Sequence, residues 1–159
     1  MGIALLAFLY FSPVTPPEEG KAATAESEAG ELPEEGLSED PDQQVEVALK
    51  QLKSGEVPPM QAILKIREVA ENYPGNIKAN FTLGVLSLQT AQYKNAVSRL
   101  SVVTKQDAEN GEAWQLIARA QLKMGDTATA RQSFARALEV VDEETGAKYK
   151  KELPELNIN

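Results

Sequence analysis

A spacing of 34 residues recurs along this chain and constrains its fold more than any other feature. An alanine and a large apolar residue four positions later occur three times at this interval: Ala62 with Ile66, Ala96 with Leu100, and Ala130 with Phe134. Two antiparallel helices pack closely only where a small residue lets the backbones approach, and a large side chain one turn later fills the space beside it. The spacing therefore predicts a repeated pair of helices, with each pair stacked on the next.

Helical periodicity continues from about residue 43 to the end of the chain. Apolar residues recur there at intervals of three and four, with no strand-like alternation. Short polar segments that contain glycine or proline separate the helical stretches, for example at 54–59, 72–76, 107–111 and 124–126. Asn76 and Asp126 are residues that cap helices, and Pro59 suits a first helical turn. An all-α fold is expected.

These residues resemble the tetratricopeptide repeat, which has a period of 34 residues. The first repeat has Leu49, Ala62, Ile66 and Pro74; the middle repeat has Leu83, Gly84, Ala96 and Leu100; the last repeat has Trp114, Ile117, Ala118, Ala130, Phe134 and Ala137. The resemblance implies an α-solenoid of about three helix-turn-helix repeats in a domain at 43–159. The expected repeats are 43–76, 77–110 and 111–144, followed by a short capping helix at 145–153.

Six positions depart from the pattern of this family, and two of them, Ala108 and Asp142, stand where the pattern has proline. Lys50 stands where the pattern has a small residue, so the first helix of the first repeat is expected to be a degenerate cap. Asn80 replaces a tryptophan, and Ser87 and Gln121 replace tyrosines. None of these residues prevents a helix. Asn80 also begins a formal glycosylation sequon, but its place inside a helix argues against a glycan.

The resemblance also implies a binding surface, because the first helices of such repeats line a concave groove. Counting from the start of each repeat places eight residues there: Lys78, Phe81, Val85, Gln89, Glu112, Gln115, Arg119 and Lys123. This mixture suits an extended or helical peptide. The expected function is a non-catalytic scaffold or adaptor that binds a protein or peptide. The alternative is a homo-oligomeric structural scaffold of the cell envelope, in which the exposed apolar face of the first repeat pairs with a second copy.

Composition argues against catalysis, cofactors and nucleic acid. The 159 residues include no Cys and no His, which removes thiolate nucleophiles and imidazole bases or ligands. No phosphate-binding loop or metal-ligand cluster is present, so no enzyme activity, cofactor or metal site is expected. Residues 1–44 carry 10 acidic and 1 basic residue, whereas 45–159 carry 14 and 15. The repeat region is thus nearly neutral and lacks the basic excess that binds phosphate backbones.

The N-terminal part suggests a membrane anchor followed by a linker. The apolar run within 1–13 covers about 15 Å at 1.5 Å per residue, roughly half of a bilayer core. We expect a partial transmembrane segment, with Met1 inside a longer helix; an apolar stub and an export signal are the alternatives. The acidic, proline-rich segment 14–42 is expected to be a disordered linker. By resemblance to small bacterial inner-membrane repeat proteins, we expect a membrane-anchored chain with periplasmic repeats, the alternative being a cytoplasmic location.

Overall fold

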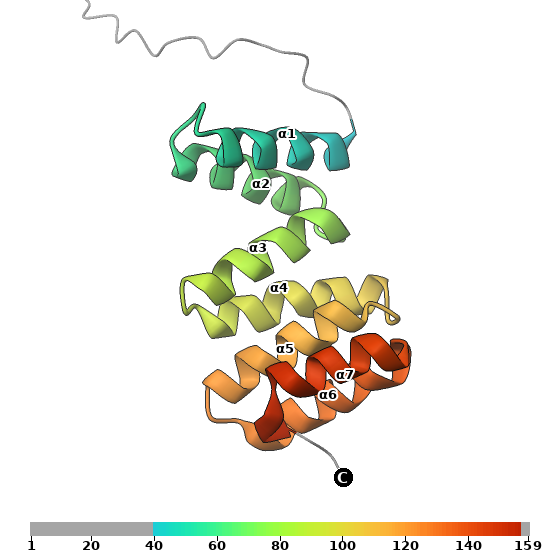
Figure 1. Ribbon diagram of the computed structural model, residues 1–159. Coiled ribbons are helices and arrows are strands. Elements are labelled where there is room, and N and C mark those ends of the chain that lie inside the picture. Colours follow the sequence, from blue (N-terminus) through green and yellow to red (C-terminus); the bar gives the residue numbers. More distant parts are fainter. Residues whose placement is uncertain (1–39, 157–159) are drawn as a thin grey trace, which may run out of the picture. The chain divides into compact units, whose positions relative to one another are not determined.

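The computed structural model describes residues 40–156, which form α-helices and one short 3-10 helix, with no strand in this part of the chain (Figure 1). The elements are α1 (Pro41–Ser54), α2 (Pro59–Asn72), α3 (Ile77–Gln89), α4 (Tyr93–Gln106), α5 (Gly111–Lys123), α6 (Thr127–Val140), α7 (Glu143–Glu152) and η1 (Pro154–Leu156). The predicted all-α fold is confirmed.

The helices begin where the sequence supplies capping groups. Asn76 accepts a hydrogen bond from the amide of Ala79 (2.7 Å), and Asp126 accepts one from the amide of Thr129 (3.1 Å). Hydrogen bonding to the side chain and backbone of Thr129 also lowers the pKa of Asp126. Pro59 is the first residue of α2, where its missing N–H has no helical partner to lose. The caps predicted at these positions are therefore confirmed.

The helices pack in consecutive pairs that follow one another in chain order (Figure 1). The pairs α3/α4 and α5/α6 make the most extensive contacts, and α4 packs on α5 to join them. The residues at the 34-residue interval lie at the centre of this packing: Ala62, Ile66, Ala96, Leu100, Ala130 and Phe134 are all fully buried. The 34-residue interval therefore arises from the packing of the second helix of each repeat, as predicted.

Gly84 shows why one first helix needs a residue without a side chain. A Cβ atom at this position would lie 2.6 Å from Cγ of Leu100, which is closer than carbon atoms approach. Leu100 is fully buried on α4, so it has little room to retreat. The glycine thus sets the distance between α3 and α4.

Hydrogen bonds between helices account for two of the departures from the repeat pattern. Asn80 is 1% exposed; its Nδ2 donates to the carbonyls of Pro74 and Asn76, and its Oδ1 accepts from Arg99. This burial leaves no access for a glycan, as expected. Gln121 accepts a hydrogen bond from Ser133 of α6 at 2.8 Å, in a buried setting. These polar residues are therefore satisfied where the family pattern has aromatic ones.

The first helix differs from the other first helices at the position of Lys50. Val45 and Ala48 of α1 are fully buried, whereas Lys50 is exposed; Gly84 and Ala118, one and two repeat intervals later, are buried. The long charged side chain of Lys50 is thus excluded from the interface with α2, in agreement with a degenerate first helix. The helix begins at Pro41, ahead of the repeat start predicted at 43, and α7 starts at Glu143 rather than 145.

The predicted membrane-anchored, periplasmic location is wrong. None of the helices within residues 40–156 is long and apolar enough to cross a membrane. The longest have 14 residues. At about 1.5 Å per residue such a helix covers about 21 Å of a bilayer core that is about 30 Å thick. The apolar run within 1–13, on which the prediction rested, and the acidic segment up to residue 39 lie outside the described residues.

Candidate functional site

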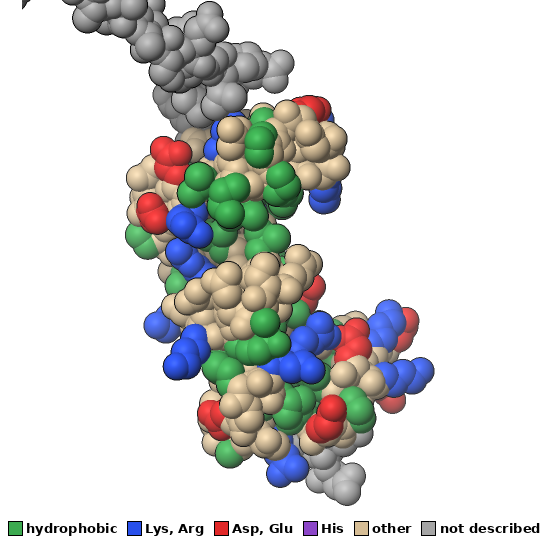
Figure 2. Space-filling view, turned by 90° about the vertical axis from the view of Figure 1, so that its left-hand side faces the viewer, with side chains coloured by type: hydrophobic (Ala, Val, Ile, Leu, Met, Phe, Trp, Pro, Cys, Tyr) green, Lys and Arg blue, Asp and Glu red, His purple; other side chains and the backbone are tan. Residues whose placement is uncertain are grey.

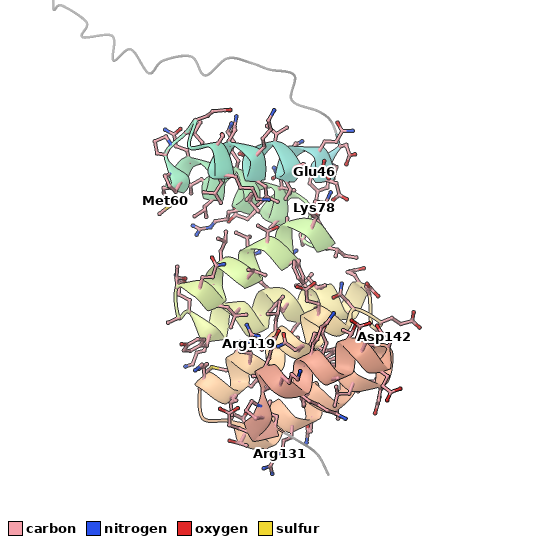
Figure 3. All side chains as sticks on the ribbon, in the orientation of Figure 1. Glu46, Met60, Lys78, Arg119, Arg131 and Asp142 are labelled. Atoms are coloured by element: carbon pink, nitrogen blue, oxygen red, sulfur yellow. The ribbon has the colours of Figure 1, made fainter. Side chains whose placement is uncertain are left out.

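The predicted groove residues of α3 lie on one face of that helix, and the first of them is engaged by α1. Nζ of Lys78, at the start of α3, donates a hydrogen bond to Oε1 of Glu46 in the first half of α1, and Figure 3 shows the two residues beside each other. This hydrogen bond raises the pKa of Lys78. The charge of Lys78 is therefore matched by a carboxylate within the protein.

Phe81 and Val85 are the apolar members of this face. Both are half-buried and pack against a core cluster that includes Leu116 and Ile117 of α5. Gln89, one turn further along, is exposed. The α3 part of the groove therefore presents partly accessible apolar side chains, with a neutral amide at one end.

Two of the four predicted groove residues of α5, Gln115 and Arg119, are engaged by Glu152 of α7. Gln115 is 2% exposed, and its Nε2 donates a hydrogen bond of 2.9 Å to Oε2 of Glu152. Nη2 of Arg119 donates to the same oxygen. Tyr149 of α7 is half-buried. Burial raises the pKa of its hydroxyl, and the negative charge of Glu112 on α5 raises this pKa further. In this part of the predicted groove, Glu152 therefore already accepts hydrogen bonds from Gln115 and Arg119.

The remaining open surface lies between α1 and α7. Figure 2 shows a hollow on its right-hand edge, between the N-terminal helix pair and α7. Glu112 and Lys123 are exposed, as is Gln89. Since Lys78 and Arg119 are paired with carboxylates, the open groove is more apolar and less basic than the eight residues suggest from the sequence.

Sequence reasoning missed the two carboxylates that engage the groove, Glu46 and Glu152. A signal was present: the Glu46 and Lys78 pair is separated by 32 residues, and the Arg119 and Glu152 pair by 33. Both separations are close to the repeat interval, which places residues on neighbouring first helices. Opposite charges at that separation predict ion pairs across the groove.

Trp114 supports the packing between repeats rather than the open surface. It is half-buried, packs against the cluster formed around Leu100 and Val103, and donates from Nε1 to the carbonyl of Ala108 at 2.9 Å. These contacts give Trp114 a role in packing. Within residues 40–156, no group of three or more Asp or Glu side chains is placed to hold a metal ion.

The arrangement of these helices matches a known repeat. Residues 88–150 match the family model described as tetratricopeptide repeat. The fold is a tetratricopeptide-repeat solenoid. The matched residues cover the last part of the middle repeat, the whole of α5 and α6, and most of α7. They include Arg119, whereas Glu152 follows the last matched residue.

Solved structures show the same tetratricopeptide architecture. The type III secretion translocator chaperone SycD of Yersinia enterocolitica has a TM-score of 0.63 and 18% identity, over 75% of this chain and 92% of that one. MamA from Desulfovibrio magneticus RS-1 has a TM-score of 0.56 and 18% identity, over 74% and 75%. No curated protein sequence matches the chain. At these identities the similarity shows the fold alone.

Proposed function

We propose that the protein is a non-catalytic adaptor that binds a segment of a partner protein in the open part of the groove. The observation that carries this proposal is the partial exposure of Phe81 and Val85, two apolar residues on one face of α3 in a tetratricopeptide solenoid. Apolar side chains that are partly buried and held by a rigid core make effective anchors for a peptide.

Two further observations support a binding role. Each group in residues 40–156 with a shifted pKa has a structural cause: an ion pair for Lys78, helix caps for Asp126 and Asp142, and burial for Tyr149. They do not converge on a pocket, as an active site would require. In addition, SycD is described as a chaperone, and chaperones act on other proteins. The shared fold supports a protein partner here.

Peptide binding in the groove can be tested directly. Random 12-residue peptides displayed on phage would be selected against the full chain, and the affinity of the selected peptides would be measured by calorimetry. Replacing Phe81 and Val85 together with alanine is expected to weaken binding by about tenfold or more, because two anchors lose their contact area. Thermal unfolding would establish that the variant is still folded.

The matched control replaces two exposed apolar residues outside the groove, Met60 and Leu64 of α2, with alanine. This pair should leave peptide affinity within about twofold, since neither residue contacts the groove. Selected peptides that lose affinity equally with both double variants, or a selection that yields no peptide, would contradict binding in the groove.

Self-association is a second candidate function, and a specific surface favours it. Met60 and Leu64 lie one turn apart on α2 and are 61% and 48% exposed, and Val47 of α1 is 49% exposed. Large apolar side chains gathered at one end of a solenoid are a common basis for pairing with another copy. One SycD structure is described as an alternative dimer, which supports this option.

Light scattering would test this surface. The full chain is expected to form a concentration-dependent dimer, and the Met60→Ala and Leu64→Ala double variant should weaken it by about tenfold, because burial of these side chains provides the attraction. The Phe81→Ala and Val85→Ala variant serves as the control and should dimerise normally. A monomer at all concentrations would exclude self-association.

A further inference from the structure

A polar pocket outside the groove lies where α2, α3 and the start of α4 meet. It has a volume of about 350 Å³. Six of its residues carry hydrogen-bonding side chains: Arg67, Ser87, Gln92, Asn95, Ser98 and Arg99. This volume is at the lower end of the range for small ligand sites, about 300–1,000 Å³. None of the lining residues is one of the eight predicted groove residues.

The pocket contains two guanidinium groups and no carboxylate. Two of the three helices around it share this bias, because α3 and α4 include Lys78, Lys94, Arg99 and Lys105 but no Asp or Glu. The third helix, α2, carries Glu68 and Glu71, neither of which lines the pocket. Figure 2 shows Lys and Arg side chains gathered along its left-hand edge at the level of these helices. In a chain with a net charge of −8, this local positive charge indicates an anionic ligand.

The two arginines retain hydrogen-bonding capacity. Neither Arg67 nor Arg99 takes part in an ion pair within residues 40–156. Arg99 donates from Nη1 to Oδ1 of the buried Asn80 at 3.2 Å, which orients its guanidinium while other N–H groups stay available. The groove differs here, since Lys78 and Arg119 each have a carboxylate partner.

We propose that this pocket binds a carboxylate from an acidic segment of a partner protein. A guanidinium holds a carboxylate through two parallel N–H···O bonds, and the nearby hydroxyls and amides provide further donors. The lining therefore suits a negatively charged hydrogen-bond acceptor. The site lies apart from the open groove, so this proposal holds whether or not the groove binds a peptide.

The test is an NMR titration of the ¹⁵N-labelled full chain with a capped glutamate hexapeptide at low salt. A capped glutamine hexapeptide, which has the same length but no charge, is the control. We expect saturable shifts at the amides of Ser87, Asn95 and Ser98 with the glutamate peptide only. Replacing Arg67, which is exposed, with glutamine should weaken binding about tenfold, the effect of losing a hydrogen bond to a charged group.

The control is Arg131→Gln, which removes the same charge from an exposed position on α6, outside the pocket (Figure 3). It should leave the affinity unchanged within about twofold, because Arg131 does not line the pocket and an exposed charge pair contributes little. Equal losses in the two variants, equal binding of the glutamine peptide, or shifts confined to the groove would overturn the proposal. A phosphoserine peptide that binds about tenfold tighter would overturn the assignment to a carboxylate.

Discussion

Replacing Phe134 with alanine is expected to lower the free energy of unfolding by about 3–5 kcal/mol. Phe134, a residue of α6, has the largest of the fully buried side chains within residues 40–156. It belongs to a core cluster with Ala118, Ala130, Leu153 and Leu156. The loss combines the removed apolar contact with the cavity left behind. Since small domains are stable by only about 5–15 kcal/mol, a change of this size consumes much of the stability.

Urea unfolding followed by circular dichroism would measure this change, with Met124→Ala as the control. Met124 is 40% exposed, so its truncation should cost less than about 1 kcal/mol. Hydrogen exchange would locate the effect. Leu153 and Leu156, which follow α7, belong to the cluster around Phe134, so exchange should rise in α7 and remain unchanged in α1 and α2. Uniform loss of protection along the chain would contradict this local coupling.

The repeat architecture was predictable because its cause is local and repeated. A small residue and a large apolar residue at fixed positions determine how each second helix packs, and Ala96 and Leu100 do so in the structure as in the sequence. The glycine at position 84 has the same explanation. Three occurrences of one pattern remove the ambiguity that a single apolar run would leave.

The state of the groove was less predictable, because it depends on α7. This helix follows the last repeat, and groove positions were counted only within the three repeats. The contact of Glu152 with Gln115 and Arg119 was therefore not predicted, although the spacing of 33 residues between Arg119 and Glu152 carried a signal. The same counting treats Gln115 as accessible, although it is 2% exposed. Pattern matching identifies the helix face and leaves open what covers it.

The arginine pocket could not be found from the sequence for a different reason. Its lining comes from α2, α3 and α4, at positions where the family pattern requires no particular residue. The buried Asn80 gave a partial signal, since a polar residue in a core position needs a partner, and Arg99 supplies it. Only the three-dimensional arrangement places Arg67 beside that pair.

Leu100→Ala is expected to destabilise the protein by about 2–5 kcal/mol, because Leu100 is fully buried between α3 and α4. Gly84→Ala alone should also destabilise it. A methyl group at 84 would lie 2.6 Å from Cγ of Leu100, and overpacking of this kind costs about 1–3 kcal/mol. The better helix propensity of alanine, about 1 kcal/mol, offsets only part of that cost.

The two changes should partly compensate when combined, because the methyl group at 84 enters space that Leu100 vacates. The double variant is expected to be more stable than the sum of the single effects by about 0.5–3 kcal/mol in urea unfolding. Gly146→Ala provides the matched control, since its Cβ would lie no closer than 3.5 Å to any neighbour. Combined with Leu100→Ala, it should be additive. If the Gly84→Ala and Leu100→Ala effects were also additive, Leu100 would not set the distance between α3 and α4. The proposed link between the 34-residue interval and helix packing would then fail at the contact between Gly84 and Leu100.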